Sequence, residues 1–159
     1  MKKLGIIPVS LFILGCHQSV QDRIIRYVEK YCTKEQDTCI VKLNNLVPFE
    51  WDTMYLFGAN VNTDFISGTI RFPYKGTIGQ PGHRKIIFTY GHHIVYEEVC
   101  NSLDHCQSII DFSSVKDSIL NLRSYSLYVN DAVFNVYREK INGGCTDCYI
   151  YHLSTINMN

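Results

Sequence analysis

The chain has 159 residues, of which 46% are hydrophobic and 19% charged, and its formal net charge is zero. This composition is typical of one globular domain and excludes a chain that is disordered throughout. No basic cluster is longer than a pair such as Lys2-Lys3, so the chain lacks the electrostatic footprint of a nucleic-acid-binding protein. We therefore expect no nucleic-acid partner. The 11 tyrosines favour β-structure.

The start of the chain has the order of an export signal. Met1-Lys2-Lys3 is a short cationic segment, and Leu4 to Leu14 is an apolar run with one proline and one serine. This run is shorter than the roughly 20 residues that a membrane-spanning helix needs. Its length suits the hydrophobic region of a secretory signal. The alternative is a buried first strand that ends in an ordinary core cysteine.

The residues ILGC at positions 13–16 resemble the lipobox of bacterial lipoprotein precursors. In that family a small residue precedes the scissile bond, and the cysteine sulfur forms the thioether to diacylglycerol. The resemblance implies cleavage after Gly15, which removes residues 1–15, and lipidation of Cys16. Because His17 is not the aspartate that signals inner-membrane retention, the resemblance also implies a place at the periplasmic face of the outer membrane.

The expected anchor leaves only a short tether. Residues 16–18 separate the lipid from Ser19, where a single globular domain over residues 19–159 is expected to begin. Extended, this tether reaches roughly 10 Å at about 3.3 Å per residue. Acyl chains that gain about 0.8 kcal/mol per buried CH2 would make the membrane attachment permanent. We therefore expect the domain to sit against the membrane.

Six cysteines remain after Cys16, and they fall into three close pairs. An even number in an exported chain predicts three disulfides. The favoured pairs are Cys32–Cys39, Cys100–Cys106 and Cys145–Cys148. Six cysteines allow 15 connectivities, and a long-range pair is one alternative. Others are a redox-active CxxC at the last pair and a zinc site formed by the last four cysteines.

The first folded elements are predicted from local patterns. Ser19 and Asp22 fit a capping box, and apolar residues then recur at helical spacing. We predict an amphipathic helix from Val20 to Cys32 that packs on a sheet, with a helix lying on the membrane as the alternative. Residues 39–43 are predicted to form a strand.

The stretch PFEWDTMYLFG, residues 48–58, gives the strongest strand signal. One face at period two carries Phe49, Trp51, Thr53, Tyr55 and Phe57, and the other carries Glu50, Asp52, Met54 and Leu56. We expect Asp52 on the exposed face, with a buried general acid as the alternative. FEWDTMYLFG also resembles a stretch of small, uncharacterised bacterial lipoproteins, which brings no activity with it.

The remaining elements are shorter. The predicted helices cover residues 62–66 and 113–122, and the predicted strands cover 85–90, 94–99, 124–129, 132–138 and 149–153. The first two of these strands form a hairpin around Gly91-His92-His93. Together the elements predict an α+β fold, in which an N-terminal helix packs on a mainly antiparallel sheet stapled by disulfides.

The chain carries none of the common catalytic or cofactor motifs. No GxSxG, HExxH, P-loop or GxGxxG pattern occurs. His92 and His93 are the most suggestive metal-binding pair, but adjacent strand residues point to opposite faces and do not easily bind one ion. We therefore predict neither a cofactor nor a metal, and favour a protein that is not an enzyme.

The anchor, the short tether and the motif pattern favour a non-catalytic, lipid-anchored envelope protein that binds a periplasmic protein partner. An immunity- or exclusion-type lipoprotein is one concrete form. Tyrosine is common in interface hot spots, although most tyrosines here are expected to pack in the sheet. Two alternatives are an envelope hydrolase that acts on cell wall or lipid, with His92 or His93 beside a carboxylate, and a carrier of a small ligand or lipid.

Overall fold

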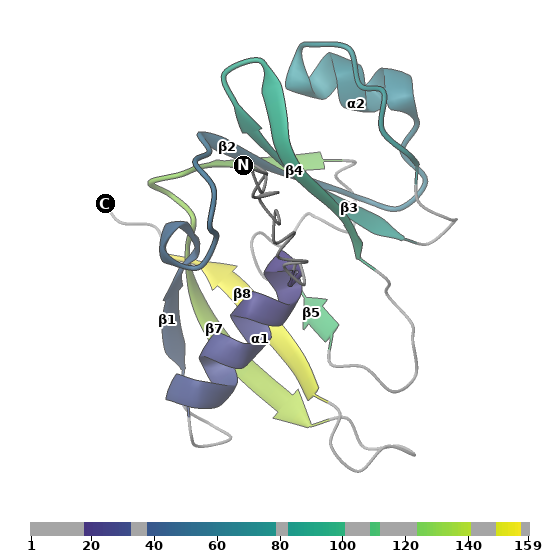
Figure 1. Ribbon diagram of the computed structural model, residues 1–159. Coiled ribbons are helices and arrows are strands. Elements are labelled where there is room, and N and C mark those ends of the chain that lie inside the picture. Colours follow the sequence, from purple (N-terminus) through teal and green to yellow (C-terminus); the bar gives the residue numbers. More distant parts are fainter. Residues whose placement is uncertain are drawn as a thin grey trace, which may run out of the picture.

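The computed structural model describes residues 18–32, 38–78, 83–100, 109–111, 124–140 and 149–156. Its elements are α1 (Val20–Tyr31), β1 (Cys39–Lys42), the 3-10 helix η1 (Leu43–Asn45), β2 (Thr53–Phe57), α2 (Thr63–Ile70), β3 (Arg84–Tyr90), β4 (His93–Cys100), β5 (Ile109–Asp111), β6 (Ser124–Tyr128), β7 (Val133–Lys140) and β8 (Tyr149–Thr155). The fold is α+β and mostly antiparallel, as the sequence predicts (Figure 1).

The strands form two sheets where the sequence analysis expected one. Sheet A has the strand order β1-β7-β8-β5, and sheet B has the order β4-β3-β2-β6. The pairing of β5 with β8 is parallel, and the other described pairs are antiparallel. β5 was not predicted, because a three-residue strand is too short to show a period.

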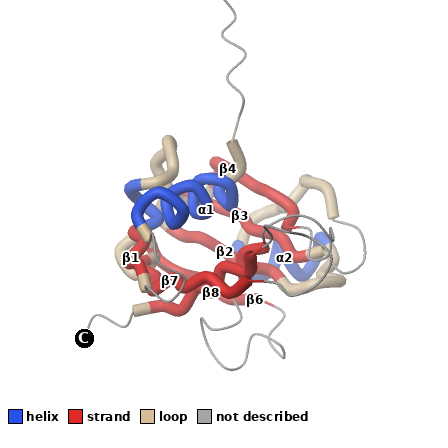
Figure 2. Tube along the Cα trace, turned by 90° about the horizontal axis from the view of Figure 1, so that it is seen from below, coloured by secondary structure: helices blue, strands red, loops and turns tan. Residues whose placement is uncertain are grey.

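One hydrophobic cluster joins α1 to both sheets. Val20, Ile24 and Val28 are buried on one stripe of the helix. The same cluster contains Val41, Phe134, Val136, Tyr151 and Leu153 from sheet A, and Met54, Leu56, Ile86, Phe88 and Leu127 from sheet B. Each such side chain contributes about 1.5–3 kcal/mol on full burial. Figure 1 shows α1 across the front of sheet A, and Figure 2 shows α1 and α2 in different parts of the molecule.

Both ends of α1 are fixed by specific contacts. Ser19 is the N-cap, as predicted, and its Oγ accepts a hydrogen bond of 3.0 Å from the Asp22 N–H. At the other end the predicted Cys32–Cys39 disulfide ties the helix to β1. The rest of the predicted cysteine chemistry lies outside the described residues, because it involves Cys106, Cys145 and Cys148. The lipidation and cleavage residues, Cys16 and Gly15, and the predicted helix over 113–122 lie outside them too.

The two-faced strand predicted over residues 48–58 is wrong in two respects. β2 begins only at Thr53, so the period of two does not extend back to Trp51. Met54 and Leu56, assigned to the face that carries Asp52, are buried in the core. β2 is an inner strand between β3 and β6, and α2 covers its second face, so both faces are apolar.

α2 covers the face of sheet B that points away from the core, called the outer face below. It begins at the predicted cap, where Asn62 Oδ1 accepts a hydrogen bond of 2.8 Å from the Phe65 N–H, but it continues past Ile66 to Ile70. Its buried residues form a second cluster, which consists of Phe57, Val61, Ile66, Ile70, Tyr74 and Ile87. The chain leaves α2 through Arg71 (φ 65°) and then runs back toward β4.

Candidate functional site: a groove beside strand β4

The predicted β3–β4 hairpin is confirmed, and its turn is held by a carboxylate. Gly91 lies in the turn with φ 59°, a conformation that favours glycine. The Gly91 N–H donates to Asp52 Oδ2 at 2.5 Å, and Thr89 Oγ1 donates to Asp52 Oδ1 at 3.1 Å. Burial raises the pKa of Asp52, but the hydrogen bonds from Gly91, Thr89 and Thr53 outweigh it and hold the pKa below its usual value. Asp52 is therefore an ionised turn residue, which disfavours the alternative role of general acid.

A β-bulge at Val95 changes which way β4 side chains point. Phe88 pairs with Tyr96 and Thr89 pairs with Ile94, so Val95 has no residue opposite it on β3. As a result Ile94 packs against the cluster under α2, whereas Tyr96 packs against the main core. In a regular strand these two residues would share one face.

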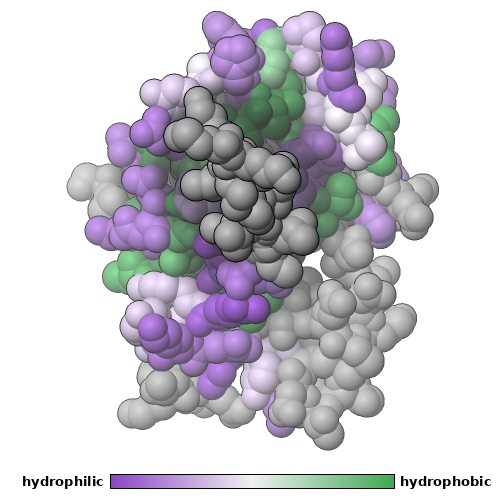
Figure 3. All heavy atoms as spheres, in the orientation of Figure 1, coloured by the Kyte–Doolittle hydropathy of each residue, from purple (hydrophilic) through white to green (hydrophobic). Residues whose placement is uncertain are grey.

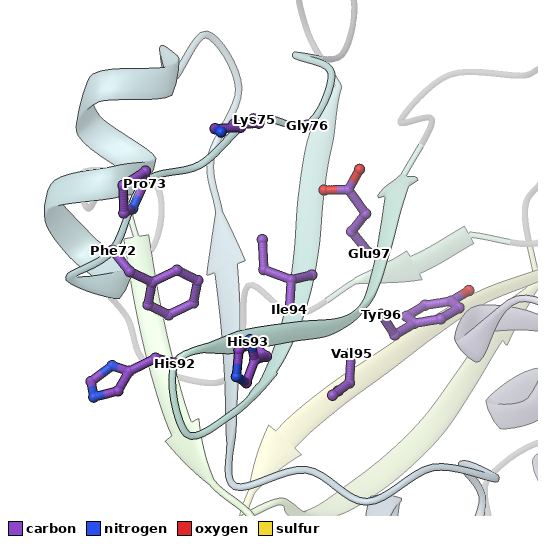
Figure 4. Close-up of a pocket in the computed structure, with 10 residues that line it drawn as sticks. All are labelled: Phe72, Pro73, Lys75, Gly76, His92, His93, Ile94, Val95, Tyr96 and Glu97. Carbon is purple, nitrogen blue, oxygen red and sulfur yellow. The ribbon is translucent and has the colours of Figure 1, made fainter.

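An open groove of about 590 Å³ lies between β4 and the segment that follows α2. Its lining residues are Phe72, Pro73, Lys75, Gly76, His92, His93, Ile94, Val95, Tyr96 and Glu97 (Figure 4). The Phe72 and His92 rings lie edge to face, with their centres 6.2 Å apart. Figure 3 shows an apolar area with hydrophilic surroundings at the top of the molecule, where Figure 1 places the hairpin and α2. The groove therefore has an apolar floor and a polar rim.

A buried lysine fixes one wall of this groove. Lys85 on β3 is only 4% exposed, and its ammonium group donates to the Tyr74 hydroxyl and the Thr77 carbonyl. It also lies 3.4 Å from Glu97 Oε2, which accepts a hydrogen bond of 2.8 Å from the Tyr74 hydroxyl. Burial raises the pKa of Tyr74, and the hydrogen bond to Glu97 and the charge of Glu97 add to this effect. The phenol therefore stays protonated and holds the loop against β4.

Gly76 is needed at this wall because the cluster leaves no room for a side chain. A Cβ there would lie 2.7 Å from Glu97 Oε2 and still closer to the Tyr74 hydroxyl. Real Cβ atoms do not approach other atoms so closely. Lys75 and Gly76 thus pass directly over the polar cluster, and this close passage shapes the groove.

The groove gathers His92 and His93 with a carboxylate, the arrangement that the hydrolase alternative named. His92 lies in the turn and His93 begins β4, and both line the groove with Glu97. Within the described ranges, no cluster of three or more His, Cys, Asp or Glu residues could hold a metal ion. Lys85 and Tyr74 were not singled out from the sequence. The one available signal was a lysine directly before the apolar run IIF in β3.

A second polar cluster lies on sheet A. His152 Nε2 is 3.0 Å from Glu139 Oε2, and its Nδ1 is 3.4 Å from Asp111 Oδ2. The Tyr137 ring stacks on the imidazole, with the ring centres 4.6 Å apart. The guanidinium group of Arg84, at the start of β3 in sheet B, lies 3.5 Å from Asp111 Oδ1 on β5 in sheet A. The cluster therefore connects the two sheets. Its ion pairs hold the edge of sheet A against sheet B.

The chain matches no model of a known protein family, no curated protein sequence and no solved structure. Neither of the two described helices is long and apolar enough to cross a membrane. The described residues that line the groove include no serine, threonine or cysteine, and its carboxylate is paired with Lys85. An apolar floor beside the outermost described strand is a kind of surface that recurs where proteins bind an extended chain segment.

Proposed function

We propose that this is a non-catalytic, lipid-anchored envelope protein that binds another protein chain through the groove beside β4. The observation that carries the proposal is the position of the groove. It opens along six consecutive residues, His92 to Glu97, at the start of β4, which is the outermost of the described strands of sheet B. An exposed strand edge with an adjoining pocket is a recurring way to recognise an extended protein segment.

The expected lipid anchor supports a site on this side of the domain. Cys16 would carry the lipid, and α1 begins only four residues later, at Val20. The Val20 N–H donates to Glu98 Oε2 on β4 at 2.8 Å. An anchor at Cys16 would therefore hold β4 near the membrane surface, where a partner that crosses or enters the envelope meets it. An immunity- or exclusion-type lipoprotein that captures an incoming protein is the most concrete form of this proposal.

Two measurements test the proposal. Mass spectrometry of the mature protein should find an acylated Cys16 at the amino terminus, and Cys16→Ser should release the protein from the membrane fraction. A photoreactive phenylalanine at His92 should cross-link a protein in intact cells. The matched control places it at Tyr31, an aromatic residue of α1 that is 59% exposed and lies outside the groove. An unacylated Cys16 overturns the anchor, and equal labelling from both positions overturns the groove as the binding surface.

A further inference from the structure

β4 is the outermost strand of sheet B among the described strands, and it is eight residues long. A strand in this position presents backbone donors and acceptors to any chain that lies beside it. The groove keeps the outer side of this edge open along His92 to Glu97. The inference below rests on the proposed function and concerns which protein chain occupies this edge.

Histidines and glutamates stand at opposite ends of the segment His92 to Glu98. His92 and His93 stand at its start, and Glu97 and Glu98 stand near its end, with apolar and aromatic residues between them. If two copies of β4 pair in parallel, histidines face histidines and glutamates face glutamates. In antiparallel pairing the histidine end of each copy meets the glutamate end of the other, where an imidazole N–H can donate a hydrogen bond to a carboxylate. The strand is therefore complementary to itself only when the two copies run in opposite directions.

The bulge at Val95 selects the register of such a pair. Ile94 packs under α2, and Glu97 binds Tyr74 on that same side, so these two residues share the outer face. Glu98 pairs with the core residue Ile86 and lies on the inner face. Faces match only when Ile94 lies opposite Glu97 of the second copy and His93 opposite Glu98 of the second copy. A slip by one residue would place inner side chains beside outer ones.

We propose that the occupant of this edge is a second copy of the chain, joined to the first through antiparallel β4–β4 pairing about a two-fold axis between Val95 and Tyr96. Sheet B then continues from one copy into the other. A two-fold interface uses the same patch on both copies, which is the commonest arrangement in homo-oligomers. Val95, 38% exposed in one copy, lies at the centre of this interface.

The test uses the full-length anchored protein in cells that express two differently tagged copies. A photoreactive phenylalanine at Val95 should give an adduct of twice the chain's mass that contains both tags. An adduct with a different protein instead overturns the second-copy inference but leaves the proposed function standing. A complete lack of adducts from Val95 contradicts both. In that case the bulge and the two glutamates are edge protection of the kind that keeps strands from associating.

A matched pair of variants tests whether the β4 edge makes the contact. Val95→Glu places a new carboxylate from each copy beside Glu97 and Glu98 of the other copy, whereas Val95→Gln has the same size without the charge. With the photoreactive residue at His92, Val95→Glu should lower the yield of the two-tag adduct at least tenfold, and Val95→Gln should retain it. Far-ultraviolet circular dichroism checks that both variants fold. Equal yields from the two variants, or a loss from both with the fold intact, would contradict pairing through β4.

Discussion

Glu98 on β4 accepts a hydrogen bond of 2.8 Å from the backbone N–H of Val20, the first residue of α1. The same carboxylate accepts from the Gln21 N–H at 3.3 Å and from the Tyr96 hydroxyl at 2.5 Å. A negative charge at a helix N-terminus is favourable, because the first N–H groups of a helix lack partners within it. One side chain thus connects the start of the folded domain to the strand that borders the groove.

Glu98→Gln should destabilise the domain by about 0.5–2 kcal/mol, because the amide keeps one acceptor but loses the charge that favours the helix terminus. Urea unfolding measures the change in the free energy of unfolding, and hydrogen exchange should show faster opening of the first turn of α1. Glu50→Gln, at an exposed carboxylate, is the control and should stay within about 0.5 kcal/mol of the wild type. Equal effects from the two substitutions would show that Glu98 does not anchor α1.

The Cys32–Cys39 disulfide should contribute measurably to stability, although it closes a loop with a sequence separation of only seven. The loop-entropy model gives about 2.5 kcal/mol for a loop of this size. The double variant Cys32→Ala, Cys39→Ala should therefore unfold at a lower urea concentration. Because Cys32 is buried, part of the loss will come from packing. An unchanged unfolding midpoint is the result that contradicts this prediction.

The features predicted from sequence are those that neighbouring residues determine. The Ser19 cap depends on a residue three positions away, the hairpin depends on the turn at Gly91, and Cys32 and Cys39 are close along the chain. The split into two sheets depends instead on pairing between distant strands, as when β1 pairs with β7. A hydrophobic period shows that a strand has a buried face but does not identify the element that covers it. The face of β2 that carries Met54 and Leu56 was misjudged for this reason.

The groove, too, depends on contacts between residues that are distant in the sequence. His92 and His93 were singled out, but their proximity to Glu97 depends on the strand edge and the bulge, which leave no clear mark in the sequence. Lys85 donates to the Tyr74 hydroxyl across a sequence separation of 11, and Tyr74 donates to Glu97 across a separation of 23. The three residues come from three different segments of the chain. Such a cluster becomes visible only when α2 is placed on the outer face of sheet B.

Asp52→Asn should destabilise the hairpin in a pH-dependent way. Because the pKa of Asp52 is lowered in the folded state, its ionised form stabilises the fold above the ordinary value of 3.8. This contribution is lost as the pH falls from 3.8 through the folded-state pKa. At neutral pH the variant should lose about 1 kcal/mol, because the Gly91 and Thr89 donors lose a charged acceptor. Urea unfolding at several pH values should show the difference from wild type narrowing below 3.8, and a difference that grows there would contradict this assignment.

Two glycine substitutions should have opposite effects. Gly76→Ala places a Cβ against Glu97 and the Tyr74 hydroxyl, so it should destabilise the domain by about 1–3 kcal/mol. Gly68→Ala is the control: it lies in α2 with open space around the added Cβ, and alanine should stabilise the helix by about 0.5–1 kcal/mol. Thermal unfolding of both variants provides the comparison. Destabilisation by Gly68→Ala, or none by Gly76→Ala, would contradict the close passage of this segment over the cluster.

Tyr74→Phe should remove a stabilising contribution that disappears at alkaline pH. Burial, the hydrogen bond to Glu97 and the charge of Glu97 raise the pKa of Tyr74 above its ordinary value of 10.0. A raised folded-state pKa means that the contribution is complete below 10.0 and is lost as the pH rises from there through the folded-state pKa. At neutral pH the variant should lose about 1–2 kcal/mol, since Lys85 and Glu97 each lose a hydrogen-bond partner.

The tyrosinate absorbance separates this effect from the titration of the other tyrosines. The wild type should contain phenols that ionise later than an ordinary tyrosine, because the pKa values of Tyr55, Tyr74 and Tyr125 are all raised, and Tyr74→Phe should remove one of the three from this late phase. Tyr128→Phe is the matched control for the loss of one tyrosine, because Tyr128 is 67% exposed and lies outside the groove. The difference in unfolding free energy between wild type and Tyr74→Phe should shrink above pH 10.0, because ionisation of Tyr74 then opposes folding in the wild type alone. A late phase of unchanged amplitude in Tyr74→Phe would show that Tyr74 does not contribute to it and would separate Tyr74 from the Lys85–Glu97 wall of the groove.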